Sequence, residues 1–292
     1  MSLPAPVLPP VGFGCSPYRH GARVDLAAAV DRALDVGYRL LDGAEVYGNE
    51  RAVGDVLRRR RAPPRTELVL VSKLWSTNHA YRDVIAACER SLRALGVDYL
   101  DLYLVHSRQA LAHRESLATI GSLAHDEAVA LAFPRDEKGN LRLTPVPLAE
   151  TWSAMESLVD RGLARAIGVS NFGVEQLTEL LSRARIRPAV NQIEHHPYRR
   201  QVEALLRCRD EGIAVMAHSP LSSPGLLADP TILALAANYR RTPAQIVLRW
   251  NVQSGVIPLP SSTDPAHIAA NLDLFGFALA PEDVAALDGL AR

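Results

Sequence analysis

The sequence predicts an α/β protein of the (β/α)8 TIM-barrel class, formed as a single domain over residues 1–292. A helical pattern that ends in glycine and leads into an apolar run recurs along the chain. The apolar runs are nearly continuous, which is typical of parallel strands that are buried on both faces. Strand and helix patterns alternate through eight such units, the number that closes a barrel. A doubly wound sheet would instead place a G-x-G-x-x-G turn after the first strand, and "VGFGCSPY" lacks it.

The elements follow one another in a regular order. The apolar runs predict eight strands at 11–14, 38–42, 67–73, 99–106, 164–170, 188–194, 213–219 and 255–260. Five helical segments end at glycines that fit the residue after a helix, where positive φ is needed: Gly37, Gly96, Gly162, Gly212 and Gly255. Thr242-Pro243 with Gln245, and Asp264-Pro265, are typical helix starts. Two helical segments are expected after the last strand.

One connection departs from this regular order. Residues 107–146 separate the fourth and fifth strands, whereas loops between strands and helices in such folds usually have about 2–6 residues. A connection of this length is typical of a functional loop. We therefore expect a lid or substrate loop at about 107–146.

Composition and charge exclude several classes of function. The 292 residues carry 32 basic and 32 acidic side chains, so a formal net charge of zero gives no electrostatic reason for a nucleic-acid or membrane partner. The N-terminus, "MSLPAPVLPP", lacks a signal-peptide pattern, and no run is long enough for a transmembrane helix. Cys15, Cys88 and Cys208 are odd in number and far apart, which favours a reducing compartment. We expect a cytoplasmic protein that is a monomer or a weak homo-oligomer.

Polar side chains gather at the predicted strand ends, where the active sites of such barrels lie. The chain has only two lysines, and Lys73 ends the apolar run "ELVLVSK". A buried lysine needs a counter-charge, and Asp42 at the end of the second strand supplies one. Tyr47 and His106 follow the second and fourth strands, and a phenol beside cations and a histidine is a proton-donor arrangement. Each of the four has an ordinary structural explanation alone, but their joint placement predicts a site.

The sequence does not predict a metal centre. Glu194, His195 and His196 are the most suggestive run. Adjacent histidines in a strand point to opposite faces, so the two cannot easily share one ion. We expect no metal.

Several motifs together resemble those of the aldo-keto reductases, in order and over nearly the whole chain. They are "LDGAEVYGNE", "SKLW", "LDLYLVH", "GLARAIGVSNF", "NQIEHHPY", "SPL" and "IP…IAANL". The resemblance implies an NAD(P)H-dependent oxidoreductase that passes hydride to the carbonyl of an aldehyde or ketone. It also implies a catalytic tetrad of Asp42, Tyr47, Lys73 and His106. In that tetrad Tyr47 is the proton donor, Lys73 paired with Asp42 lowers the tyrosine pKa from its usual ~10, and His106 orients the carbonyl.

The resemblance also implies a set of coenzyme contacts. Ser170, Asn171 and Gln192 are expected to contact the carboxamide. His218 is expected against the nicotinamide ring, in place of the family's usual aromatic residue. The pyrophosphate is expected along Ser219, Leu221 and Ser223, and the adenine at Asn271. The 2′-phosphate of NADP(H) usually meets a lysine or arginine after the last strand. Here Ser261, Ser262, Thr263 and His267 stand in that region. NADP(H) is favoured and NAD(H) is the alternative, unless Arg240 or Arg241 supplies the missing charge.

The substrate site departs further from the family pattern. His106 is followed by Ser107 rather than tryptophan, and the long loop follows at once. An open or polar site is expected, or one rebuilt by that loop, for a small carbonyl compound that is sugar-like or natural-product-like. Two other functions compete with this one. A nicotinamide-binding redox sensor with little turnover would not need all four groups, and a metal-dependent hydrolase would need a His-x-His motif after the first strand, which is absent.

Overall fold

Eight parallel strands form the centre of the computed structural model, which describes residues 6–16, 18–19, 22–23, 26–60, 63–113 and 117–291. The strands are hydrogen-bonded in the order β1-β4-β5-β6-β7-β8-β9-β10, and every neighbouring pair is parallel. They span Phe13–Gly14, Leu40–Asp42, Val69–Leu74, Leu100–Val105, Ala164–Ser170, Val190–Glu194, Ala214–His218 and Val256–Pro258. Each lies within or almost within a predicted run, so the predicted strands are confirmed. The first five residues of "MSLPAPVLPP" lie outside the described residues.

The two edges of the sheet meet. The amide of Gly12 donates to Pro258 O at 3.0 Å, and that of Gly14 donates to Pro260 O at 2.9 Å. These bonds join β1 to the end of β10, so the sheet closes on itself. The (β/α)8 barrel is therefore confirmed, with one addition that the sequence did not predict: a short antiparallel hairpin of β2 (Tyr18–Arg19) and β3 (Ala22–Arg23).

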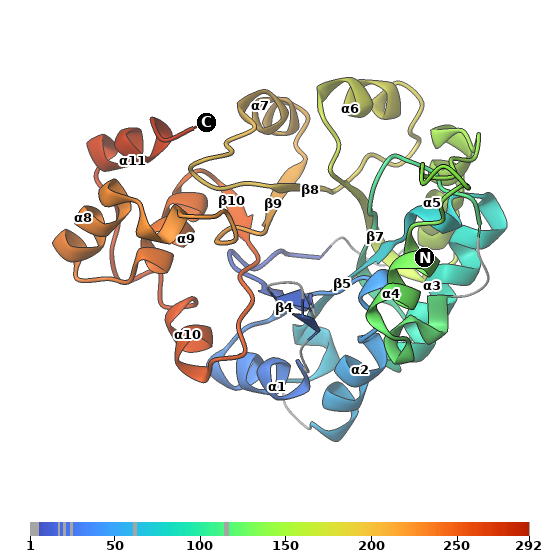
Figure 1. The fold of residues 1–292 in the computed structure, drawn as a ribbon, viewed down its shortest axis with the longest axis horizontal. Helices are drawn as coiled ribbons and strands as arrows, with labels where there is room; N and C mark the ends of the chain where they lie inside the picture. Colours follow the sequence, from blue (N-terminus) through green and yellow to red (C-terminus); the bar gives the residue numbers. More distant parts are fainter. Residues whose placement is uncertain are drawn as a thin grey trace.

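Helices form a ring outside the strands, as Figure 1 shows, with α8 to α11 on one side of the barrel and α3 to α5 on the other. They are α1 (Ala27–Val36), α2 (Glu50–Arg59), α3 (Tyr81–Leu95), α4 (His125–Ala132), α5 (Leu148–Asp160), α6 (Val174–Leu181), α7 (Val202–Asp210), α8 (Pro230–Tyr239), α9 (Pro243–Gln253), α10 (Pro265–Ala270) and α11 (Pro281–Asp288). The five predicted helix-ending glycines all have positive φ. The predicted starts of α9 and α10 are confirmed, because Thr242 and Asp264 accept hydrogen bonds from the first turns of these helices. None of the helices within the described residues is long and apolar enough to cross a bilayer.

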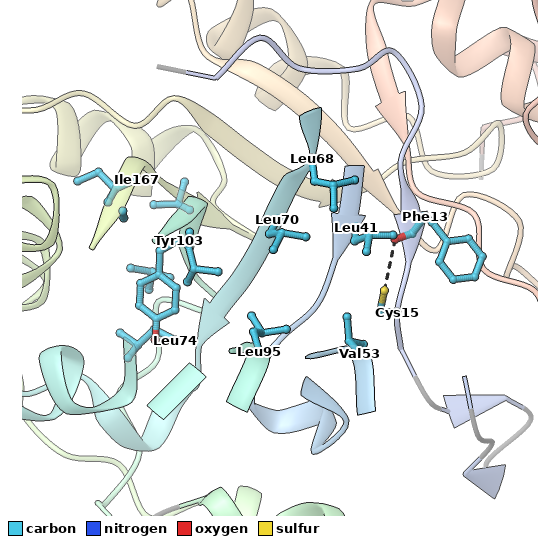
Figure 2. Packing of buried hydrophobic residues seen from close by; sticks show 14 of the residues in the cluster. Phe13, Cys15, Leu41, Val53, Leu68, Leu70, Leu74, Leu95, Tyr103 and Ile167 are labelled. Atoms are coloured by element: carbon cyan, nitrogen blue, oxygen red, sulfur yellow. Dashed lines mark hydrogen bonds between the residues drawn. The ribbon is translucent and has the colours of Figure 1, made fainter. Parts of the chain in front are cut away.

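The apolar residues form two layers because side chains alternate along a strand. One set, which includes Leu40, Val71, Leu104 and Met216, fills the inside of the barrel. The other set lies between the strands and the helices. Figure 2 shows part of this outer layer, with Leu41 and Leu70 of neighbouring strands above Val53 and Leu95 of α2 and α3. The barrel is thus a packed scaffold, and polar groups are left for its rim.

The long connection is more ordered than a simple loop. It contains the 3-10 helix η4 (Leu117–Ser122) and α4, and its residues 114–116 lie outside the described part of the chain. The amide of Leu111 donates to Ser76 O at 2.8 Å, and Ile120 and Ala132 pack in one cluster with Trp75. The segment is therefore attached to the loop after β5. Its role as a lid or substrate loop remains a prediction.

Candidate active site

The inward-facing side chains of the strands turn from apolar to polar at one end of the barrel. Leu40 precedes Asp42 by two positions, Val71 precedes Lys73, and the same spacing leads from Leu104 to His106. Because alternate residues of a strand share a face, each polar group continues the row that fills the barrel interior. Gln192 of β8 and His218 of β9 follow Val190 and Met216 in the same way. The regular alternation of the strands therefore directs these groups to one place.

A buried ion pair lies at the base of this place. The Lys73 ammonium is fully buried and donates to Asp42 Oδ2 at 2.8 Å and to Gly43 O at 2.8 Å. Gln192 Nε2 donates to the other carboxylate oxygen, Asp42 Oδ1, at 2.7 Å. Burial disfavours the ammonium, but Asp42 and Tyr47 outweigh that effect, so the pKa of Lys73 is raised and the side chain is a cation. The predicted pairing of Lys73 with Asp42 is present in the structure.

Tyr47 lies close to the cation of this ion pair. It ends the 3-10 helix η1 (Glu45–Tyr47), and the Lys73 nitrogen is 5.2 Å from the centre of its ring. Burial raises the pKa of Tyr47 above its ordinary value, although the charge of Lys73 opposes this shift. The sequence-based expectation of a lowered pKa is thus corrected in its net direction, because burial outweighs the cation. A phenol in this state keeps its proton at neutral pH, as a proton donor must.

His106 faces the same point from the end of β6. Its ring centre is 6.0 Å from that of Tyr47 and 5.0 Å from that of Trp75, with both neighbours edge-on. Burial, then the charge of Lys73, lower the pKa of His106 well below its ordinary value, so the imidazole is neutral. A neutral imidazole has one N–H to donate, which suits a group that binds a carbonyl oxygen.

His218 and Asn171 form a second polar pair beside His106. The imidazole Nε2 of His218 lies 2.9 Å from Asn171 Oδ1, and Asn171 Nδ2 donates to His106 O at 3.0 Å. Burial lowers the pKa of His218 to about 4, so this ring is also neutral at pH 7. Ser170 lies behind the pair, where its hydroxyl donates to Gln192 O at 2.9 Å.

A cleft of about 1300 Å³ runs outward from these groups over the ends of β7 to β10. The predicted residues on its wall are Asp42, Tyr47, His106, Asn171, Gln192, His218, Ser219, Leu221, Ser223, Ser261, Ser262, His267 and Asn271. Its volume exceeds that of typical small-molecule pockets, about 300–1,000 Å³, and suits an extended dinucleotide.

Comparison with known proteins assigns the family. The aldo/keto reductase family model matches residues 11–292. Aldo-keto reductase family 1 member A1 of Homo sapiens is 39% identical over 98% of this chain and 86% of its own length, and member A1-A of Danio rerio is 39% identical over 98% and 87%. The aldose reductase structure from Schistosoma japonicum has a TM-score of 0.88 and 36% identity, covering 98% of this chain and 90% of its own.

The chain belongs to the aldo/keto reductase family. It is accordingly an oxidoreductase that acts on carbonyl groups with a nicotinamide coenzyme. The carboxyl-end location of the cleft is that of catalytic sites in other barrels of this class.

Three predicted residues of this aldo/keto reductase do not line the cleft. Lys73 is fully buried beneath it and contacts the wall residue Asp42. Ser170 is only 1% exposed and its hydroxyl donates to Gln192 O, so its expected contact with the carboxamide stays a prediction. Thr263 is exposed but lies off the wall, because the chain turns there into α10.

Other residues on the wall were not predicted, notably Ser16, Ser222 and Thr242. Ser16 follows the end of β1, so the strand-end rule that found Asp42 would have found it too. Ser222 lies between two predicted residues in "SPLSSPGL". Thr242 had no such signal, since its position depends on how α8 and α9 pack against the barrel.

The histidine pair after β8 has structural partners. His195 stacks on Trp250 with 4.7 Å between ring centres, and its Nδ1 lies 2.8 Å from Asn251 Oδ1. His196 contacts Glu194 at 3.1 Å. Both lie just beyond β8, so the alternation of side chains along a strand does not apply to them.

Proposed function

We propose that this chain is an NAD(P)H-dependent reductase of aldehydes or ketones in which Tyr47 donates the proton. The observation that supports this proposal most is the position of Tyr47. Its protonated phenol lies over the buried Lys73 cation, and it shares the wall of the cleft with His106. The substrate carbonyl would bind between these two side chains.

Each member of the group has a distinct task. When bound, a reduced nicotinamide supplies the hydride that reduces the carbonyl carbon. Tyr47 then gives its proton to the oxygen on which negative charge develops, and Lys73 stabilises the resulting phenolate. His106, being neutral, donates a hydrogen bond that orients the carbonyl. Asp42 holds Lys73 in place and offsets the cost of burying its charge.

The cleft suits the coenzyme from one end to the other. Asn171, Gln192 and His218 line the cleft together with Tyr47 and would contact the nicotinamide, with Ser170 bonded to Gln192 O behind them. Ser219, Leu221 and Ser223 border the middle, where a pyrophosphate needs hydroxyl and amide donors. Asn271 also lines the cleft and would contact the adenine.

The 2′-phosphate of NADP(H) has few partners here. No lysine or arginine is present on the described wall of the cleft, where Ser261, Ser262 and His267 stand instead. Arg241 pairs with Asp273 at 3.0 Å and lies off the wall, as does Arg240. The family resemblance favours NADP(H). Because the charged partner is missing, we expect NAD(H) to be accepted as well, with only a small preference between them.

The substrate is proposed to be a small carbonyl compound. The aldose reductase of Schistosoma japonicum is named for a sugar, which supports a sugar-like substrate, and a natural-product-like carbonyl fits the long segment beside the site equally well. A cytoplasmic location and a monomeric or weakly associating state remain part of the same proposal.

The test compares initial rates of NADPH and NADH oxidation with one reactive aromatic aldehyde, for the wild type and Tyr47→Phe. We expect turnover by the wild type and a loss of about 10²–10⁴-fold in kcat for the variant, the usual contribution of a general acid. Coenzyme binding by Tyr47→Phe, followed by fluorescence titration, should persist. The two kcat/KM values of the wild type should lie within about tenfold of each other.

Two results would contradict this proposal. Equal rates for wild type and Tyr47→Phe would remove the proton-donor role. Tight coenzyme binding without turnover of any aldehyde or ketone offered would favour the alternative of a nicotinamide-binding sensor.

A further inference from the structure

The turn that carries Tyr47 is anchored by a buried carboxylate. Glu45 begins η1, two residues before Tyr47, and only 5% of it is exposed. Its Oε1 accepts from Arg90 Nη2 at 2.7 Å and from Arg90 Nε at 3.3 Å. Its Oε2 accepts from Asn78 Nδ2 at 2.8 Å. Both oxygens of the carboxylate are therefore engaged, and neither oxygen faces the cleft.

These partners connect the turn to the part of the barrel that supplies Lys73. Asn78 ends the 3-10 helix η3 (Ser76–Asn78), which directly follows β5, the strand that carries Lys73. Arg90 belongs to α3, the helix that follows η3, and four-fifths of its side chain is buried. Glu45 thus ties the turn that presents the phenol to the elements that position the ammonium.

The other side of the turn rests on the long segment after β6. Gly48 follows Tyr47 with a φ of 62°, and a side-chain carbon placed on it would lie 2.6 Å from Gly121 N. Val46 packs in the same cluster as Ile120 and Trp75. One side of the turn is therefore held by close apolar packing, and the other side is held by the carboxylate of Glu45.

We propose that Glu45, through Arg90 and Asn78, is a positioning residue for the proton donor Tyr47. This inference rests on the proposed function, in which the Tyr47 hydroxyl must come within about 2.6–3.2 Å of the carbonyl oxygen. A misplacement of about 1 Å can cost on the order of 10²-fold in rate. A carboxylate held on both oxygens resists such a shift, because any movement of η1 would leave a buried charge without its partners.

The experiment removes the anchor step by step. Arg90→Met replaces the guanidinium with an apolar side chain. Arg90→Lys keeps the positive charge but loses the contact made by two nitrogens. Glu45→Gln keeps the shape of the side chain and removes its charge. Glu89→Gln is the matched control on α3, because Glu89 makes only an exposed ion pair with Arg161. Tyr47→Phe is measured in parallel.

We expect kcat to fall about 10- to 100-fold in Arg90→Met and less in Arg90→Lys. Glu45→Gln should lie between them. Coenzyme affinity should stay within twofold of wild type, because none of these side chains lines the cleft. The solvent deuterium isotope effect on kcat should increase, since a displaced phenol makes proton transfer more rate-limiting. Glu89→Gln should match the wild type in every measurement.

The outcomes separate the two proposals. Suppose that Tyr47→Phe is inactive, whereas Glu45→Gln and Arg90→Lys fold and keep the wild-type kcat and isotope effect. The positioning role is then wrong and the proposed function stands. If Tyr47→Phe itself is active, the proposed function fails first. A parallel loss of coenzyme affinity and kcat would show that the substitutions disturb the whole site and not only the turn that carries Tyr47. That result would also overturn the inference. Should Arg90→Met fail to fold, the two conservative variants decide.

Discussion

At the scale of single residues, the site depends on a charge buried inside a barrel. Lys73 is fully buried, and its favourable contacts are with Asp42, Gly43 and the phenol of Tyr47. Removing one member of a buried pair is costly because the remaining charge loses its compensation. The same cation opposes the burial effect on the pKa of Tyr47. Lys73 therefore serves both the stability of the barrel and the chemistry proposed for it.

Lys73→Met is predicted to lower the free energy of unfolding by about 3–5 kcal/mol, because the buried Asp42 side chain would lose its ion-pair partner. Denaturant unfolding followed by circular dichroism measures this loss. Lys138→Met is the matched control, since Lys138 is exposed, and it should change stability by no more than about 0.5 kcal/mol. The double variant with Asp42→Asn should regain part of the loss. If the single variant Lys73→Met were as stable as the wild type, the prediction would be contradicted.

At the scale of elements, α2 carries a buried carboxyl that faces the outer side of β5. Glu50 lies in the first turn of α2 and accepts a hydrogen bond from the Ser72 hydroxyl at 2.6 Å. Burial raises the pKa of Glu50 from 4.5 to about 7, and the bond from Ser72 reduces this shift only in part. The neighbouring Glu45 is held by Arg90, so the two carboxylates of this motif have different environments.

The raised pKa of Glu50 predicts a dependence of stability on pH. The folded protein holds a proton that the unfolded chain releases between pH 4.5 and about 7, so stability decreases as pH rises through that range. Glu50→Gln removes this effect. Its stability relative to wild type should therefore increase from pH 5 to pH 8, by up to about 3 kcal/mol. Urea unfolding at both pH values tests this, with Glu203→Gln, an exposed first-turn residue of α7, as a control that should show no such change.

At the scale of the whole molecule, closure of the barrel positions one wall of the cleft. The strands at the two edges of the sheet meet where Gly14 approaches the chain after β10. Gly14, Ser261 and Ser262 all line the cleft, so closure brings the two ends of the sequence to one wall. The tetrad comes from β4 to β6, whereas this wall comes from the closing strands.

Gly14→Ala is predicted to destabilise the protein by about 1–3 kcal/mol, the usual cost of forcing extra volume into a packed site. A side-chain carbon there would lie 2.8 Å from Leu259 O, so β1 and β10 would have to separate. Thermal unfolding should show a lower Tm, and coenzyme affinity should fall with it. Gly289→Ala is the control, because its added carbon would have neighbours no closer than 3.4 Å. A Tm equal to that of wild type would mean that closure tolerates the extra carbon.

The sequence by itself determined the barrel and the position of the tetrad. Nearly continuous apolar runs and the glycines at helix ends are local properties, so the sequence alone predicted the eight strands and the positions of Asp42, Lys73 and His106 at the strand ends. The same rule would have placed Ser16 on the cleft.

Only the tertiary structure decided the properties that depend on burial and on contacts between residues distant in the sequence. The net shift in the pKa of Tyr47 follows from its burial beside Lys73 and Asp42, which no local sequence pattern records. The bond from the Ser170 hydroxyl to Gln192 of β8 and the ion pair of Arg241 with Asp273 likewise depend on distant partners. The anchor of Glu45 likewise joins side chains more than 30 positions apart in the sequence. Such contacts arise only when the barrel closes, because closure brings remote segments into the same low-dielectric interior.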